Sequence, residues 1–246
     1  MPALPFDLTF GVFAVLAASV LLGALVQSTI GLGLGLIAVP VFAVAAPETL
    51  PGVLLVLVMP LLVLVMGREL GAVDRAALVP LLAGRVIGTL AAVWLLLVLS
   101  SSALNLLFGA TILAGVALSL VVADLTPTRP TQVLAGAASG LFATAAAVGG
   151  PPLGLLYQRR PGPELRATLS AVFLIGGALS LAALSAASRL TGPHLTLAAL
   201  LLPALLGGYA LSRPVRAYLD VGWLRPAVLA FAGLGGVLAI LRGLLG

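Results

Sequence analysis

Long uninterrupted apolar segments dominate this chain. Residues 8–30, 51–67 and 167–188 form runs that approach or exceed the roughly 20 residues a helix needs to cross a bilayer core. Only 8% of the residues are charged, whereas a soluble domain carries about 25%, so this chain cannot build a soluble surface. The runs are continuous and rich in Leu and Ala, without the alternating pattern of barrel strands. The sequence therefore predicts an all-α polytopic membrane protein.

Proline, glycine and charged residues divide the chain into predicted helices. The first five are expected at 8–29, 35–46, 48–67, 74–98 and 100–123. The second five are expected at 130–147, 151–160, 163–189, 194–217 and 222–245. The spacers are short, and the first residues lack a basic segment and a cleavage site, so we expect no soluble domain and a retained first helix rather than a signal peptide.

The two halves of the sequence share landmarks at a fixed spacing. Three residue pairs are each 116 positions apart: Gly33 and Gly149, Pro47 and Pro163, and Glu48 and Glu164. The spacing indicates one unit written twice, with a first repeat over 1–123 and a second over 124–246. The same glycine-rich break interrupts both copies, and in transporters such breaks commonly mark the substrate site.

The arginines test the topology of these two repeats. If 8–46 and 130–160 each cross the membrane once, the arginines of the loops divide evenly between the two sides. If each segment instead folds back at its glycine break, nearly all of them share one side, as the positive-inside tendency requires. The residues placed together are then Arg68, Arg75, Arg129, Arg159, Arg160, Arg166, Arg213, Arg216 and Arg225, with Arg189 and Arg242 opposite. We therefore predict two inverted repeats, each a glycine-broken helical hairpin plus three transmembrane helices, with both termini facing outward.

The glycine breaks are candidate binding elements. A break frees backbone N–H groups at the start of the next half-helix, where the helix dipole favours an anion, and proline suits such a start. The candidate substrate-binding residues are Gly31, Gly33, Gly35, Gly149, Gly150, Pro151 and Pro152. The alternative is that these glycines only allow close helix packing, but their recurrence in both copies favours a site.

Arg85 is the second candidate feature. It lies about 16 Å along its predicted helix, near mid-membrane, where a charge is costly and usually functional. We predict no acidic residue at this depth, so a permeating anion is its expected partner; snorkelling or a structural role is the alternative. Further residues considered as lining the site are Gln27, Ser28, Thr144, Arg166, Thr168 and Tyr209. For these, local hydrogen bonding, a loop charge or core packing is the competing interpretation.

The sequence also resembles a known family. Gly31 to Gly35 followed by Pro40, and Val148-Gly149-Gly150-Pro151-Pro152 followed by Arg166-Ala167-Thr168, resemble the TauE/SafE family of sulfite and organosulfonate exporters, also called the toluene-sulfonate uptake permease family. The resemblance covers essentially the whole chain. It implies transport of small sulfur-containing anions, often outward; the sulfur is implied by the resemblance alone.

Together these features predict a secondary transporter that works by alternating access in the cell (plasma or inner) membrane, and the resemblance implies an exporter. The chain has no Lys and hence no P-loop, so an ion or substrate gradient would supply the energy, with protons the default. We expect no enzyme activity, cofactor, metal or nucleic-acid partner; the expected partners are the anion and the bilayer, and a homodimer stays open. A passive anion channel or a non-transporting membrane subunit is the alternative.

Overall fold

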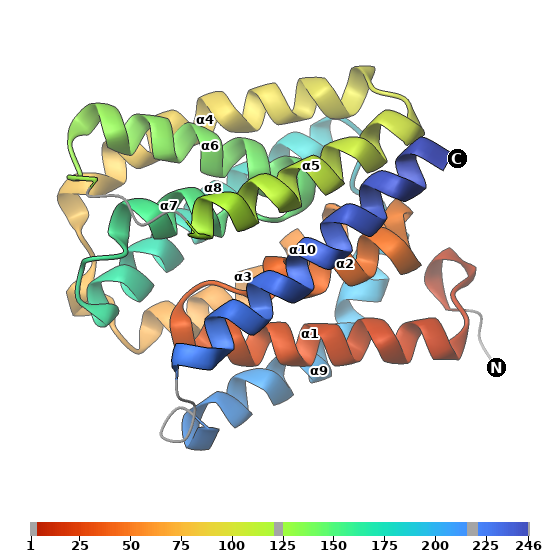
Figure 1. The fold of residues 1–246 in the computed structure, drawn as a ribbon, viewed down its shortest axis with the longest axis horizontal. Helices are drawn as coiled ribbons and strands as arrows, with labels where there is room; N and C mark the ends of the chain where they lie inside the picture. Colours follow the sequence, from red (N-terminus) through yellow and green to blue (C-terminus); the bar gives the residue numbers. More distant parts are fainter. Residues whose placement is uncertain (1–3, 121–124, 216–220, 246) are drawn as a thin grey trace.

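The computed structural model describes residues 4–120, 125–215 and 221–245, and over these ranges the protein is all-helical (Figure 1). The helices of the first half are α1 (Phe10–Ile30), α2 (Leu34–Ala45), α3 (Gly52–Gly67), α4 (Arg75–Val98) and α5 (Ser101–Leu120). Those of the second half are α6 (Arg129–Ala146), α7 (Gly150–Tyr157), α8 (Gly162–Ala186), α9 (Gly192–Val215) and α10 (Val221–Leu245). The predicted all-α class is confirmed, and each predicted helix has a counterpart within a few residues.

Several helices are suited to a membrane. Among the described residues, four are long and apolar enough to cross one: Phe10–Ile30, Arg75–Val98, Gly162–Ala186 and Gly192–Pro214. Many large apolar side chains point outward, such as Phe10, Leu90 and Trp94, each more than half exposed. In water such a surface would be unfavourable, but it suits contact with lipid. The protein is therefore a multi-pass membrane protein.

The two ends of the molecule differ in charge. Both termini lie at one end, on the right in Figure 1, where the ring of Phe6 packs edge-on against His194 at the start of α9. At the opposite end, the α3–α4 link (residues 68–74) is tied to the start of α8, where Arg166 forms an ion pair with Glu69. We call these the termini end and the arginine end, since the latter also carries Arg159 and Arg160 of the α7–α8 link.

Two helices are half the usual length, and they run in opposite directions. After α1 reaches the arginine end, the chain turns back and α2 runs from the interior toward the termini end (Figure 1). After α6 approaches the termini end, α7 runs from the interior toward the arginine end. Their lengths, 12 and 8 residues, correspond to about 18 and 12 Å, so neither crosses a bilayer core.

Helix pairs recur with the two halves exchanged. Helix α1 packs on α9, and its counterpart α6 packs on α4. In the same way, α2 packs on α10 and α7 on α5. The third pair of contacts is α3 on α9 and α8 on α4. The pairs α3–α8 and α5–α10 join equivalent helices. This pattern is what a duplicated chain would give, although the inverted relation of the two halves stays a prediction.

Helices α4 and α6 pack backbone to backbone. A Cβ atom on Gly84 would lie 2.0 Å from the carbonyl oxygen of Val133, and one on Gly88 would lie 1.9 Å from that of Ala137. From the other side, a Cβ on Gly136 would lie 2.1 Å from the carbonyl oxygen of Leu81. Small residues four positions apart are the usual means of such close approach in membranes. The contact brings Arg85, between Gly84 and Gly88, directly against α6.

Candidate anion-binding site

The two glycine breaks contact each other inside the molecule. A Cβ on Gly35, at the start of α2, would lie 2.3 Å from the carbonyl oxygen of Ala147, which ends α6. A Cβ on Gly150, at the start of α7, would lie 3.2 Å from the Cβ of Leu32 in the first break. Any side chain at Gly35 would push the breaks apart, so glycine is required there for the close approach.

The first break directs the start of α2 inward. Gly31 ends α1 with φ 97° and Gly33 precedes α2 with φ 151°, conformations that favour glycine. The Oε1 atom of Gln27 accepts a hydrogen bond from the N–H of Leu34 at 3.0 Å. The other N–H groups of this first turn, on Gly35 and Leu36, have no acceptor within the helix because of helix geometry.

The second break ends α6 and begins α7. Ala147 takes a left-handed conformation with φ 56°, and its N–H donates to the carbonyl of Ala143 at 2.8 Å. Pro151 and Pro152 occupy the first turn of α7, where no N–H donor is needed. The carbonyl of Gly149 accepts the hydroxyl of Ser139 in α6 at 2.8 Å, so this oxygen already has a hydrogen-bond donor.

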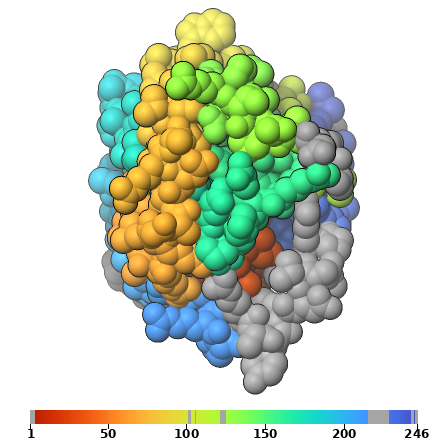
Figure 2. Space-filling model, turned by 90° about the vertical axis from the view of Figure 1, so that its left-hand side faces the viewer, coloured from red at the N-terminus to blue at the C-terminus, as the bar shows by residue number. Residues whose placement is uncertain are grey.

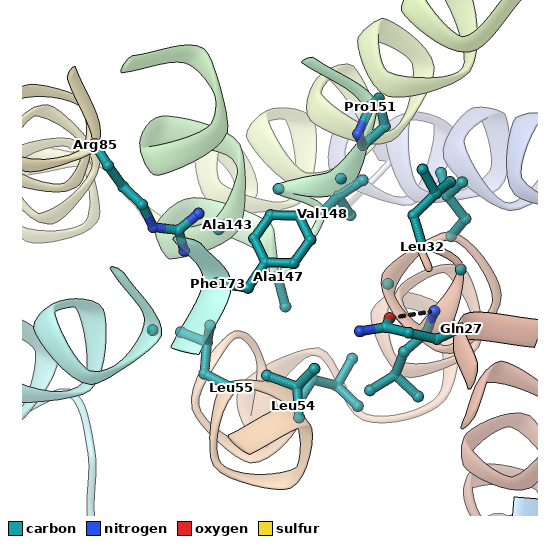
Figure 3. A pocket seen from close by; sticks show the side chains of 18 residues that line it. Gln27, Leu32, Leu54, Leu55, Arg85, Ala143, Ala147, Val148, Pro151 and Phe173 are labelled. Atoms are coloured by element: carbon teal, nitrogen blue, oxygen red, sulfur yellow. Dashed lines mark hydrogen bonds between the residues drawn. The ribbon is translucent and has the colours of Figure 1, made fainter. Parts of the chain in front are cut away.

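Arg85 enters this region from α4 (Figure 3). Its side chain is 1% exposed, and its Nη1 donates to Ser139 Oγ at 2.9 Å. Its buried Nε has no hydrogen-bond partner, and its Cζ lies 5.5 Å from the centre of the Phe173 ring. A Cβ on Gly176 would lie only 1.7 Å from Nε, so this glycine makes the space that the guanidinium fills. The charge is therefore buried with unused donor capacity.

These groups surround a small cavity of about 60 Å³, the site cavity. Seven of the predicted residues line it: Gln27, Gly33, Gly35, Arg85, Gly149, Gly150 and Pro151. In Figure 3 the Gln27 amide nitrogen and the Arg85 guanidinium reach the cavity from opposite sides, with Phe173, Leu54 and Leu55 between them. The polar side chains of the lining can donate hydrogen bonds, and no carboxylate is among them. Such a lining suits a small anion.

Two predicted binding residues lie beside the cavity. Gly31 precedes the lining residue Leu32, and a Cβ there would lie 2.7 Å from Arg166 Cγ. Pro152 is buried in the first turn of α7, next to Pro151 in the sequence. Neither residue lines the site cavity, so a role for them would come through the shape of the breaks.

The side chains of Ser28 and Thr144 are engaged elsewhere. Ser28 Oγ donates to the carbonyl of Ala24, one turn earlier, at 2.6 Å. Thr144 Oγ1 donates to Thr89 Oγ1 at 3.2 Å and lies 2.7 Å from Ser180 Oγ. These hydroxyls join α4, α6 and α8 rather than lining the cavity.

The remaining candidates lie at the arginine end. Arg166 donates from Nε to both carboxylate oxygens of Glu69, at 3.2 and 2.9 Å. Thr168 Oγ1 accepts the N–H of Asp74 at 2.9 Å. Tyr209 donates its hydroxyl to the carbonyl of Leu64 at 3.2 Å, and its ring lies under the guanidinium of Arg68 at 3.9 Å. None of the three lines the site cavity.

Sequence reasoning missed three residues of this region: Ser139, Phe173 and Gly176. Ser139 and Gly176 position Arg85, and Phe173 lines the cavity. A partial signal existed, because Gly84 with Gly88 and Gly136 with Gly140 have the spacing of close-packed membrane helices. That pairing would have placed α6, and with it Ser139, against Arg85. In the described residues no cluster of His, Cys, Asp and Glu could hold a metal.

Comparison with known proteins identifies the family. No curated protein and no solved structure matches the chain. The family model described as sulfite exporter TauE/SafE matches residues 15–239. This match covers nearly the whole sequence, including both glycine breaks and Arg85. The chain therefore belongs to the TauE/SafE sulfite exporter family.

Proposed function

We propose that this protein is a secondary transporter that exports a small sulfur-containing oxyanion such as sulfite. The observation that carries the proposal is the site cavity, where the starts of two half-helices and the buried guanidinium of Arg85 face one space. Helix starts and a guanidinium both favour negative charge. Family membership supports an anion exporter of the membrane and supplies the sulfur.

The size of the site cavity favours sulfite over larger organosulfonates. The cavity of about 60 Å³ exceeds the 10–15 Å³ or so that a single water requires. It is far below the roughly 300 Å³ at which pockets for drug-sized ligands begin. A compact oxyanion is therefore the ligand class that fits this conformation.

Alternating access would follow from an inverted arrangement of the two halves. The recurrence of helix pairs with the halves exchanged, and the opposite directions of α2 and α7, support this arrangement. Each half then contributes one half-helix to the site, and motion of one half against the other opens the site to one side at a time. A proton gradient is the proposed energy source.

Flux of radiolabelled sulfite into liposomes that contain the purified protein tests the proposal. Arg85→Ala removes the buried charge, and a charged hydrogen bond contributes about 1.5–3 kcal/mol, so sulfite affinity should fall at least about tenfold. Arg75→Ala is the matched control, because Arg75 begins the same helix and is exposed. Its flux should equal that of the wild type.

Other outcomes would identify the alternatives. Flux that rises linearly with sulfite concentration, without saturation, would indicate a passive channel. Absence of both flux and binding for every small oxyanion would indicate a non-transporting subunit. Equal loss in Arg75→Ala and Arg85→Ala would remove Arg85 from the site.

A further inference from the structure

A second, larger cavity lies next to the proposed anion site. It encloses about 210 Å³ and is lined from α1, α2, α5, α7, α8 and α10, with Ser119 and Gln158 among otherwise mostly apolar residues. Its lining includes the ends of α1 and α7 and the start of α8, so it lies toward the arginine end. Figure 2 views this end, where the red atoms of α1 lie recessed beside the green-to-teal segment of α7. We call this cavity the vestibule.

Only a thin partition separates the vestibule from the site cavity. Leu32, Leu36 and Pro151 line both cavities. On the termini side, by contrast, a cavity of about 440 Å³ near His194 shares no lining residue with the site cavity. Of these two neighbouring cavities, the vestibule is therefore the one that adjoins the site cavity.

Leu32 is the member of this partition that can move. Leu36 and Pro151 belong to the first turns of α2 and α7, whereas Leu32 lies in the non-helical link between α1 and α2. It is flanked by Gly31 and Gly33, both with positive φ, and glycine allows large backbone rotations at little steric cost. Hinges of this kind absorb the motion of gates and lids.

The side chain of Leu32 packs over the glycine face of α7. A Cβ on Gly150 would lie 3.2 Å from Leu32 Cβ, and one on Gly154 would lie 2.9 Å from Leu32 Cδ2. These glycines, one helical turn apart, form a groove that receives the side chain. The contact between the Leu32 side chain and α7 is apolar and contains no hydrogen bond, whereas the two ends of the link are held by the hydrogen bonds Gly31 N–H to Gln27 O and Ile37 N–H to Gly33 O.

We propose that Leu32 is the gate between the vestibule and the anion site, and that it opens by rotation of the Gly31–Gly33 link away from the α7 groove. The proposal rests on the proposed function for the identity of the permeating ion. The gate itself is defined by the two cavities and the partition between them.

Cysteine labelling tests the gate without relying on transport. The chain has no cysteine, so Val58→Cys, in the lining of the site cavity, supplies one thiol behind the gate. A small anionic methanethiosulfonate reagent is added from the arginine end of protein in liposomes. Leu32→Ala should raise the labelling rate about tenfold or more, because the half-buried leucine side chain no longer blocks the path. Leu32→Trp should lower the rate by a similar factor.

Ser119→Cys, which lines only the vestibule, is the matched control and should be labelled at the same rate in all three backgrounds. Rates at Val58→Cys that do not depend on residue 32 would overturn the gate. Sulfite is then added as a competitor. If residue 32 controls labelling and sulfite does not protect Val58→Cys, the gate stands and the sulfite assignment fails; protection by sulfite supports both.

Discussion

Gln27 illustrates how one hydrogen bond determines the polarity of a site. An amide side chain can present either its oxygen or its nitrogen. Here the oxygen is occupied by the N–H of Leu34 at 3.0 Å, which leaves the nitrogen directed into the cavity in Figure 3. Because its oxygen is bound at the start of α2, Gln27 presents a hydrogen-bond donor to the cavity. The corresponding position in the second half, 116 residues later, is Ala143, which also lines the cavity but offers no polar group.

Gln27→Glu should abolish sulfite binding while the fold is retained. A carboxylate oxygen can accept the Leu34 N–H as the amide does, but the second oxygen then places an acceptor and a negative charge in the cavity. Thermal unfolding of the purified protein measures both effects. We expect an unchanged midpoint without ligand and no rise with sulfite, against a clear rise for the wild type. A rise equal to that of the wild type would exclude Gln27 from the site.

The sequence identified some residues of the site and missed or misplaced others. Arg85 and the glycines of the breaks stand out because a charge or a backbone break is costly in an apolar helix. Ser28, Thr144 and Thr168 do not stand out in this way, because a short hydroxyl side chain can bond to the nearest backbone or hydroxyl group. The hydroxyl group of Ser139 is of the same kind, but it accepts a hydrogen bond from Arg85. A helix that is apolar all round gives no periodic signal of which face meets which neighbour, so sequence could not separate these cases.

At the scale of elements, glycine controls how closely helices approach. The pairs Gly84 with Gly88 and Gly136 with Gly140 bring α4 and α6 into backbone contact. Helix bounds were predictable because proline, glycine and charged residues end the apolar runs. The sequence predictions did not include the pairing of α4 with α6, although the spacing of these glycines could have indicated it. Nearby proline, glycine and charged residues determine where a helix ends, whereas the helix that it packs against depends on residues far apart in the chain.

Gly88→Val should destabilise the protein. The Cβ atom would lie 1.9 Å from the carbonyl oxygen of Ala137, so α4 and α6 must separate, and overpacking of this kind costs about 1–3 kcal/mol. The thermal midpoint in detergent should fall accordingly. Gly11→Val is the control, because no atom lies within 4 Å of a Cβ at Gly11 in α1. Equal midpoints for the two variants would contradict the close contact.

At the scale of the whole molecule, charge and chain direction agree. The arginine end contains Arg159, Arg160 and Arg166, whereas Arg189 in the α8–α9 link donates to the carbonyl of Leu96 near the end of α4. Arg216 lies outside the described residues, and so do the side chains of Arg225 and Arg242. The even number of crossings that the hairpins imply leaves both termini at one end, as Figure 1 shows. The count of arginines predicts this sidedness because the positive-inside tendency acts on whole loops.

Labelling of single cysteines in intact cells should reveal this sidedness. The wild-type chain has no cysteine, so each variant reports one position. Arg75→Cys and Arg159→Cys should react only after the membrane is made permeable, because the positive-inside tendency places the arginine end in the cytoplasm. Arg189→Cys should react with a membrane-impermeant reagent in intact cells. Reaction of all three from the same side would contradict the inverted arrangement.

The contact between the two glycine breaks has a consequence for release of the ion. The start of α2 and the side chain of Gln27 come from the first half, and the start of α7 comes from the second. An ion that contacts both halves is bound more tightly than either half alone could bind it, as in any bivalent contact. If the two halves separate, each half alone holds the ion weakly. In the proposed alternating-access mechanism, movement of one half against the other would therefore lower the affinity as it opens the exit. Opening and release would then be one event, and the proposed mechanism needs no separate step to expel the ion.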